Sequence, residues 1–425
     1  MSGPETRPLE TDGVVDHGQV HEELDRKVLH NRNYLNFIAS RTFSSIGFQS
    51  ITVALGWMIY DQTQSAYMLG LVGLFQFLPM AILTFAVGAV ADRFERRRIA
   101  MICQVVEALA VAGLGVLVWH GLLTPQLILV AVAILGAAQA FERPTMAALL
   151  PGIVGTDMLQ RAVATSTSFM QTALIVGPSL GGIFYGIGPV VPFVVSTVLF
   201  CLAGGNVRLI KMVHKPAPRA PMSFGTVFAG VAFIRSKPEM LGTISLDLFA
   251  VLLGGATALL PIFASDILKA GPIGLGMLRA APAVGALMMS LVLARWPLEA
   301  GAGRKMFAAV AVFGVATILF SLSTNVTLSI LALLVIGASD TISVVVRSSL
   351  VQLMTPDDMR GRVNAVNSLF IGTSNQLGEF ESGMLAGLVG PVATGVIGGV
   401  GTIAVVLIWM RLFPQLAKVE RLDGR

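Results

Sequence analysis

Charged residues are scarce in this chain. Asp, Glu, Lys and Arg make up only 12% of its 425 residues, whereas they form about a quarter of a soluble globular protein. Hydrophobic residues reach 55% and the mean hydropathy is +0.79. Such a chain has too few polar side chains to cover a surface in water. We therefore expect the lipid bilayer to be its solvent.

Cysteine and histidine are also rare. The two cysteines, Cys103 and Cys201, stand far apart in apolar stretches, which excludes a disulfide framework and a cysteine-rich metal site. The five histidines lie in the N-terminal tail or in loops and form no set. No P-loop, nucleophile elbow or paired-aspartate diphosphate motif is present. We expect no enzyme, no catalytic residues, no cofactor and no metal.

Long apolar runs take up most of the sequence. A spanning helix needs about 20 mostly apolar residues. Twelve segments meet this requirement: 36–60, 68–91, 99–120, 126–148, 162–185, 190–210, 241–267, 273–294, 305–323, 326–350, 363–389 and 391–412. The fold class predicted from them is an all-α polytopic membrane protein.

Basic residues collect in alternate loops. If the N-terminal side is cytoplasmic, the cytoplasmic loops carry nearly all Lys and Arg, and the opposite loops carry only Lys269. This asymmetry predicts cytoplasmic termini and insertion in the inner (plasma) membrane. The basic pI near 9.5 is then explained by topology, and we expect no nucleic-acid partner. The expected partner is the lipid bilayer, and the expected assembly state is a monomer.

The predicted helices divide into two sets of six. We expect a disordered cytoplasmic tail at 1–35, a six-helix bundle at 36–210, a cytoplasmic linker at 211–240, a second bundle at 241–412 and a C-terminal tail at 413–425. Within the linker, Phe224, Val227, Phe228 and Val231 recur at helical spacing, which favours an interfacial helix. An irregular connector is the alternative.

The two predicted bundles contain related sequence. Arg143 and Arg347 are each followed six residues later by leucine, and Pro79 and Pro282 occupy equivalent places. Repeats in the same orientation imply two bundles related by an axis along the membrane normal, with a binding site between them.

Two motifs resemble those of a known superfamily. The segment 88–97 reads Gly-x-x-x-Asp-Arg-x-x-Arg-Arg and is similar to the signature between helices 2 and 3 of the major facilitator superfamily. Its members here are Gly88, Asp92, Arg93, Arg96 and Arg97, with Glu95 where glycine is usual. In the fifth predicted helix, an antiporter-like motif contains Gly177, Pro178, Gly181 and Gly182. The resemblance implies twelve helices in two six-helix bundles.

The second half resembles the enterobactin-exporter-like group of this superfamily. The stretches that carry the resemblance are 340–347, 355–362 and SNQLGEFESG, 374–383. The resemblance implies export of a siderophore- or drug-like small molecule by proton antiport. Lysophospholipid flipping and proton-coupled uptake remain alternatives within transport. A membrane-embedded enzyme or a sensor is the alternative outside it.

Several polar residues fall inside predicted spans. A charge at the bilayer centre costs about 2.5–3.5 kcal/mol, so it must pair, meet water or serve function. The candidates for a substrate and proton pathway are Gln49, Asp247, Arg279, Asp340, Glu379 and Glu381. A structural ion pair is the alternative for both aspartates and for Arg279. We assign Glu107 to the scaffold.

The charged bend at 92–98 has two interpretations. Its arginines fit anchoring to anionic headgroups, but Asp92 does not contribute to that anchoring. We expect Asp92 to dock on the N-terminus of the eleventh helix, whose dipole attracts an anion. The partners expected there are Arg360 and Arg362, with Arg143 as the alternative. This contact would close the cytoplasmic side.

Overall fold

The computed structural model describes residues 30–155, 158–211, 224–296, 298, 301–356 and 359–420. Side chains at 84–89, 91–93, 224–227, 256 and 365 are outside the described part. The described chain is helical. The expected disordered tail lies almost wholly outside the described residues, as does the first part of the linker.

Six long helices form the first half of the molecule. They are α2 (Arg32–Thr63), α3 (Ala66–Arg93), α4 (Arg96–Trp119), α5 (Pro125–Val154), α6 (Leu159–Ile187) and α7 (Val191–Leu209). The side chain of Asn31 caps α2 by accepting from the backbone N–H groups of Asn33 and Tyr34 at 3.0 and 3.3 Å. Such a cap satisfies donors that lack a partner within the helix.

The second half repeats this plan after a short linker helix. Its elements are α8 (Phe224–Arg235), α9 (Pro238–Leu253), η1 (Ala256–Leu259), α10 (Leu260–Ile262), η2 (Phe263–Ile267), α11 (Gly271–Arg295), α12 (Ala302–Leu322), α13 (Val326–Met354), α14 (Arg360–Val389), α15 (Pro391–Leu412) and α16 (Pro414–Ala417). The linker helix α8 packs against α14 and α9. Phe228 is 70% exposed on it.

The seventh span is not the continuous helix predicted over 241–267. It breaks after Leu253, and a 3₁₀ turn, one α turn and a π turn follow. The cause is the Gly254-Gly255 pair, which weakens the helix and lets α14 approach. A Cβ built on Gly255 would lie 2.6 Å from the carbonyl oxygen of Gly378 and 2.7 Å from Ser382 Oγ.

Eleven of the described helical segments are long and apolar enough to cross a membrane. The helix α14 is the twelfth long one, and it spans 30 residues. It is more polar than the others because it carries Arg360, Arg362, Glu379 and Glu381. It packs against α3, α9 and α15, so protein rather than lipid surrounds much of it. The prediction of an all-α, polytopic, twelve-helix protein is confirmed.

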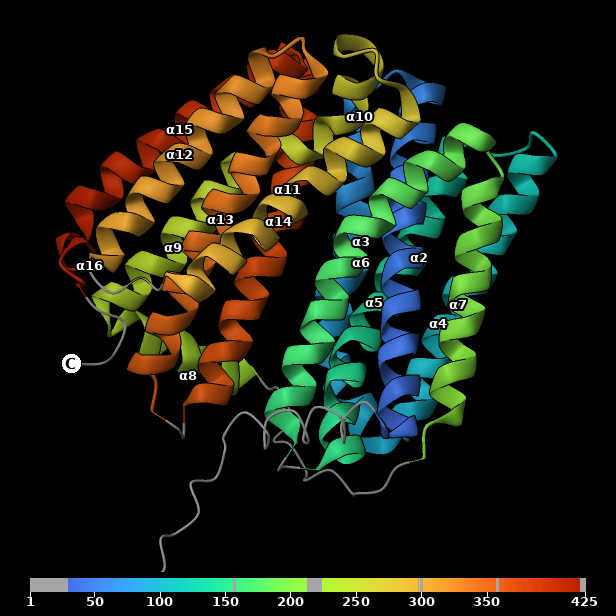
Figure 1. Ribbon diagram of the computed structural model, residues 1–425, viewed down its shortest axis with the longest axis horizontal. Coiled ribbons are helices and arrows are strands. Elements are labelled where there is room, and N and C mark those ends of the chain that lie inside the picture. Colours follow the sequence, from blue (N-terminus) through green and yellow to red (C-terminus); the bar gives the residue numbers. More distant parts are fainter. Residues whose placement is uncertain are drawn as a thin grey trace, which may run out of the picture.

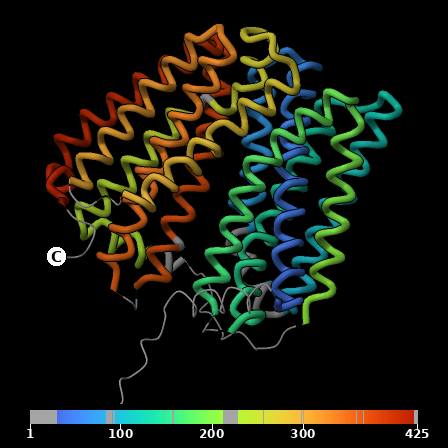
Figure 2. The backbone as a smooth tube through the Cα atoms, viewed as in Figure 1, coloured from blue at the N-terminus to red at the C-terminus, as the bar shows by residue number. Residues whose placement is uncertain are grey.

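The two halves lie side by side and meet at one end (Figure 1). We call the end that holds α8 and the start of α2 the linker end, and the opposite end the far end. The helices of the two halves converge at the far end and diverge toward the linker end (Figure 2). Contacts between halves run mainly through the pairs α6–α11 and α3–α14.

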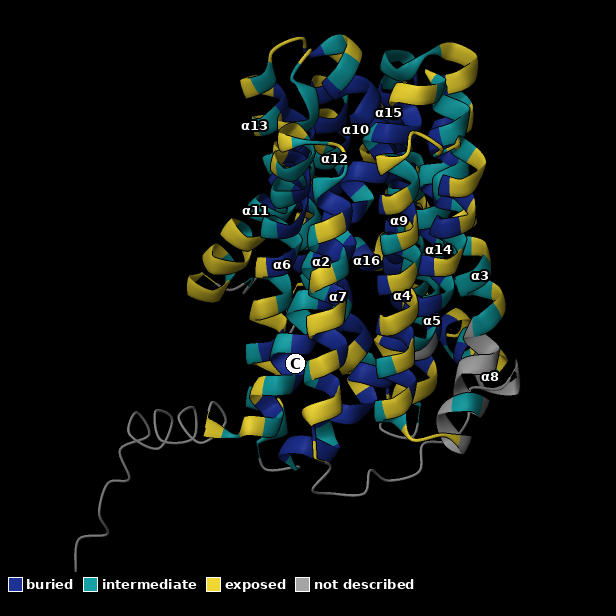
Figure 3. Cartoon of the chain, turned by 90° about the vertical axis from the view of Figure 1, so that its right-hand side faces the viewer, coloured by how far each residue is buried: buried dark blue, intermediate teal, exposed yellow. Residues whose placement is uncertain are grey.

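Exposed apolar side chains face outward, as lipid contact requires. In Figure 3 the exposed positions run along the outer faces of α4 and α7. They include Val105, Leu109, Val116, Val194 and Val198, whose exposed fractions range from 47% to 68%. In water such a surface would be an aggregation hazard, whereas in a bilayer it is the surface that lipid covers.

The C-terminal segment is attached to the second half. The side chain of Leu416 in α16 is fully buried. The backbone N–H groups of Ala302 and Gly303 donate to the carbonyl oxygens of Glu420 and Val419, at 3.3 and 3.0 Å. These bonds satisfy N–H groups at the start of α12 that have no acceptor inside that helix.

Candidate functional site

A buried ion pair lies at the centre of the second half. The carboxylate of Asp247 on α9 is bonded by the guanidinium of Arg347 on α13, and both residues are about 95% buried. The hydroxyl of Ser343 donates to the other carboxylate oxygen at 3.3 Å. The structure therefore shows an ion pair at Asp247, and a transport role for this residue stays a prediction.

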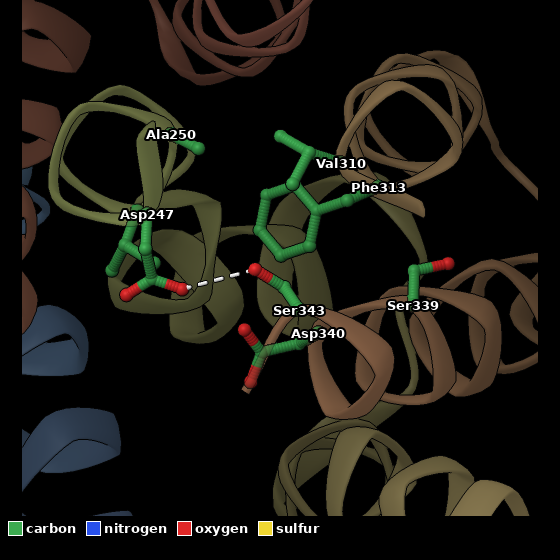
Figure 4. A pocket seen from close by; sticks show the side chains of 8 residues that line it. Asp247, Ala250, Val310, Phe313, Ser339, Asp340 and Ser343 are labelled. Carbon is green, nitrogen blue, oxygen red and sulfur yellow. Dashed lines mark hydrogen bonds between the residues drawn. The ribbon is translucent and has the colours of Figure 1, made fainter. Parts of the chain in front are cut away.

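A small cavity adjoins this ion pair (Figure 4). The helix α9 contributes Asp247, Ala250 and Val251, α12 contributes Val310 and Phe313, and α13 contributes Ser339, Asp340 and Ser343. Ser343 points toward Asp247 across the space between α9 and α13 (Figure 4). Asp340 is one helical turn from Ser343 and lines the same cavity. The structure thus brings the predicted residues Asp247 and Asp340 together.

Two opposite charges lie where the halves meet. Arg279 on α11 and Glu379 on α14 are close enough to attract each other electrostatically. A Cβ built on Gly56 of α2 would lie 3.5 Å from the Arg279 guanidinium, and one on Gly73 of α3 would lie 3.3 Å from a Glu379 carboxylate oxygen. Both side chains therefore reach the first half. The Nε of Arg279 is buried without a hydrogen-bond partner.

The structure separates the two acids of α14. Glu379 faces α3, where a Cβ built on Gly73 would lie 3.0 Å from the Glu379 Cβ, whereas Glu381 is not among the nearest contacts of the described α3 glycines. This agrees with their helical spacing, which places them on different faces. Gln49 lies elsewhere, at the contact of α2 with α6. A Cβ built on Gly177 of α6 would lie 2.6 Å from the Cβ of Gln49. Gln49 and Glu381 do not join the other candidates.

A second polar cluster occupies the first half. The side-chain amide of Gln139 donates through one nitrogen to Glu107 Oε1 at 2.7 Å and to Glu142 Oε2 at 2.9 Å. Likewise, Gln104 Nε2 donates to Glu142 Oε1 at 2.8 Å and to Ser40 Oγ at 3.0 Å. The two glutamines and two glutamates are all at least 93% buried.

Arg143 stands at the edge of this cluster. Its Nε donates to Gln139 Oε1 at 2.8 Å, and its guanidinium carbon lies 5.9 Å from the centre of the Phe48 ring. The residue itself is exposed. Phe48 lines a small cavity with Thr52 of α2 and Gln76 of α3. Arg143 therefore extends from the buried cluster to an exposed position beside Phe48.

The arginines after the charged bend hold the linker end of the first half together. Arg96 donates to the carbonyl oxygen of Ala148 at 3.4 Å, and Arg97 donates to that of Ile210 at 2.8 Å. Glu95 pairs with Arg97 at 3.0 Å and with Arg98 at 2.9 Å. The side chains of Gly88, Asp92 and Arg93 lie outside the described residues.

The expected docking site for Asp92 is the start of α14. Arg360 is the first residue of this helix, and Arg362 is exposed in its first turn. A Cβ built on Gly230 of α8 would lie 2.8 Å from the carbonyl oxygen of Arg362. The linker helix thus packs directly against the beginning of α14.

Small residues of α6 bring the two halves into backbone contact. A Cβ built on Gly182 would lie 2.5 Å from the carbonyl oxygen of Pro272 and 3.0 Å from Gly276 Cα. A Cβ built on Gly276 would in turn lie 2.7 Å from the carbonyl oxygen of Pro178. Gly181 and Gly177 instead pack on α2 of their own half. One face of the motif therefore joins the halves, and the other joins α6 to α2.

Sequence reasoning did not include Gln104, Gln139, Glu142 and Arg347 among the site residues, and it assigned Glu107 to the scaffold. A signal was present for some of them. Glu142 and Arg143 follow Gln139 by three and four residues, and Glu107 follows Gln104 by three, so the members of each set lie near one helix face. Among the residues that the structure describes, no three His, Cys, Asp or Glu side chains are grouped to hold a metal ion.

Comparison with known proteins identifies the family. Residues 29–424 match the family model described as transmembrane secretion effector. The chain belongs to this family. Transmembrane secretion effectors are transporters of the major facilitator superfamily, so both the superfamily and the exclusion of an enzyme agree with the sequence expectation.

Relatives of known name cover almost the whole chain. The enterobactin exporter EntS of Citrobacter koseri is 25% identical over 392 residues, which cover 90% of this chain and 92% of that protein. EntS of Escherichia coli O157:H7 is 24% identical over 401 residues, covering 91% and 94%. This transmembrane secretion effector is therefore a multi-pass membrane transporter homologous to an enterobactin exporter.

Solved structures share the fold at low sequence identity. A point mutant of the nucleoside transporter NupG superposes with a TM-score of 0.71 at 14% identity, covering 90% of this chain and all of that one. An inward-facing bacterial homologue of the iron transporter ferroportin gives 0.67 at 15%, covering 91% and 98%. An inward-facing homologue of the lysosomal transporter Spinster gives 0.67 at 14%, covering 93% and 98%.

Proposed function

We propose that this transporter exports a small, amphiphilic molecule from the cytoplasm in exchange for protons, by alternating access. The observation that carries the proposal is the pair Arg279 and Glu379, located where the two halves meet. Ionisable groups inside a membrane protein are rare, and they often mark the pathway of a substrate or an ion. In two-bundle transporters the binding site lies between the halves.

The arrangement of the halves supports an inward-facing state. We place the linker end in the cytoplasm, because Arg96, Arg208, Lys237, Arg295 and Arg304 begin or end helices there, and Lys269 lies at the far end. The halves touch at the far end and diverge at the linker end (Figure 2). We assign the protein to the inner (plasma) membrane, as a monomer with both termini cytoplasmic.

The relatives suggest the substrate class. They are named enterobactin exporters, so we propose a siderophore- or drug-like molecule. The Arg279 guanidinium, whose Nε lacks a partner, would bind an acidic or carbonyl oxygen of the substrate. Antiport requires that substrate and proton bind in alternation, so a substrate that engages this site would displace a proton from Glu379. Asp340, beside the Asp247–Arg347 pair, is a second candidate acid, and it lines the small cavity of the second half.

Inverted membrane vesicles test this function. Enterobactin is the probe, and its accumulation is measured under an imposed pH gradient with and without a protonophore. Proton antiport predicts accumulation that the protonophore abolishes, and enterobactin-stimulated proton release. Accumulation independent of the gradient, together with movement of a labelled lysophospholipid between leaflets, would instead identify a flippase. Accumulation only in right-side-out vesicles would identify uptake.

A further inference from the structure

We propose that Glu107 and Glu142 form a proton-binding pair in the first half, and that Arg143 connects this pair with the space between the halves. The inference rests on the proposed proton coupling and names the residues that carry the proton. It concerns side chains outside the Asp247–Arg347 and Arg279–Glu379 pairs.

The hydrogen bonds of the cluster lack one donor. Both donors of Gln139 go to the two carboxyl groups, and both donors of Gln104 go to Glu142 and Ser40. Two acceptors, Glu107 Oε2 and Gln104 Oε1, are left buried without a partner. They are three residues apart on one face of α4. A proton on Glu107 Oε2 supplies the missing donor, which removes the cost of an unsatisfied buried acceptor.

The charges of the cluster lead to the same assignment. One amide nitrogen bonds both carboxyl groups at 2.7 and 2.9 Å, so two negative charges would lie close together in an apolar site. Among the described residues, no arginine forms a salt bridge with either glutamate, in contrast to the bond between Arg347 and Asp247. Like charges at this distance disfavour double ionisation, and a shared proton relieves the repulsion.

Other titratable groups face the pair from the surrounding helices. Arg143 of α5, Arg41 of α2 and Cys103 of α4 interact with it electrostatically. The guanidinium of Arg41 donates to Ser166 on α6 at 3.0 Å. From α7, Gly204 faces Gln104. The helix α3 carries no acid or base between residues 68 and 91. The pair is thus surrounded by two arginines that do not bond it.

Arg143 makes the pair responsive to the space between the halves. Because Arg143 donates to Gln139 Oε1, the oxygen of that amide is held toward the arginine and its nitrogen toward both carboxyl groups. Loss of the proton breaks the O–H bond of Glu107, the proton passes to water, and the pair becomes doubly negative. The guanidinium of Arg143 is then drawn toward the carboxylates. Proton binding reverses this movement.

Reconstituted protein provides the transport test. Enterobactin accumulation driven by a pH gradient is compared with exchange of labelled for unlabelled enterobactin at equal pH on both sides. We expect Glu107→Gln and Glu142→Gln to lower gradient-driven accumulation at least tenfold while exchange persists. Glu107→Asp should retain part of the gradient-driven activity. The matched control is Asp61→Asn, an exposed acid at the far end of α2.

Infrared spectroscopy provides a readout without substrate. In the wild-type protein, the carbonyl band of a protonated carboxylic acid should change with pH, and Glu107→Gln and Glu142→Gln should remove this change, whereas Asp61→Asn should not. Gradient-driven accumulation that survives in both glutamine variants would overturn the proposal, as would loss of exchange in folded variants. If the wild type were not driven by a pH gradient, the proposed function would fail. The infrared titration would still show whether the pair binds a proton.

Discussion

At the residue scale, the buried charges of the two halves are compensated in different ways. In the second half, Asp247 is neutralised directly by Arg347. In the first half, the carboxyl groups of Glu107 and Glu142 are bonded by amides. A direct ion pair holds two helices in a fixed arrangement, whereas an amide can serve either protonation state of a carboxyl group. The first arrangement suits a scaffold, and the second suits a group that exchanges protons.

The ion pair gives a stability prediction. Arg347→Met leaves Asp247 buried and uncompensated, so we expect it to destabilise the fold by about 3–5 kcal/mol. The double variant Asp247→Leu/Arg347→Met removes both charges and should recover most of this loss. Thermal unfolding of the purified protein in detergent measures both effects. Equal stability of the single variant and the wild type would show that the pair contributes little.

At the element scale, the seal between halves depends on helix backbones in direct contact. Sequence analysis identified an antiporter-like glycine motif in α6, and the structure adds its packing partner, the segment around Pro272 and Gly276 on α11. The broken seventh span, α14 and the linker helix α8 form a second group of packed elements. Sequence could not predict these pairings because hydropathy and periodicity contain no information on partners.

Substitution of Gly182 tests the seal. A Cβ at this position meets backbone atoms at 2.5–3.0 Å, which cannot move aside as a side chain can. We expect Gly182→Val to separate α6 from α11, to lower transport at least tenfold and to raise proton leak in proteoliposomes. Gly113→Ala is the control, because a Cβ there has nothing within 4 Å. An unchanged leak with Gly182→Val would contradict a seal at this contact.

The charged bend gives a second prediction at this scale. If Asp92 docks on the N-terminus of α14 in the outward-open state, Asp92→Asn should lower transport several-fold while expression stays intact, because the amide loses the charge that the helix dipole attracts. Glu95→Gln is the control, since Glu95 pairs only with Arg97 and Arg98 of its own helix start among the described residues. Equal transport by Asp92→Asn and wild type would reject the docking.

At the scale of the whole molecule, the balance between the inward-facing and outward-open states depends on bonds between the two halves. The hydroxyl of Tyr60, near the end of α2, donates to the carboxylate of Asp266 in η2. This bond joins the halves at the far end, where they are closed (Figure 1). A hydrogen bond to a charged group contributes about 1.5–3 kcal/mol, and here that energy favours the closed far end.

Removal of this hydroxyl should shift the equilibrium. We expect Tyr60→Phe to increase the outward-open population relative to the inward-facing one by about tenfold or more. Spin labels at Leu122 and Thr324, exposed in far-end turns of opposite halves, report the change as a longer distance in pulsed electron resonance. Tyr185→Phe deletes a hydroxyl within the first half and is the control. Identical distance distributions for Tyr60→Phe and wild type would contradict the role of this bond.

The sequence by itself determined that the solvent is the lipid bilayer, how many helices span it and which superfamily the chain resembles. It also identified most of the charged residues that lie inside the spans. Hydropathy and the positive charge of loops act locally along the chain, so they can be recognised without knowledge of contacts. The tertiary structure decided which polar groups lie together: Asp247 with Arg347 in an ion pair, Arg279 near Glu379, and Glu107 with Glu142 on either side of the Gln139 amide. The physical reason is that a buried polar group is stabilised by its partner, and helix packing alone brings partners from distant parts of the chain together.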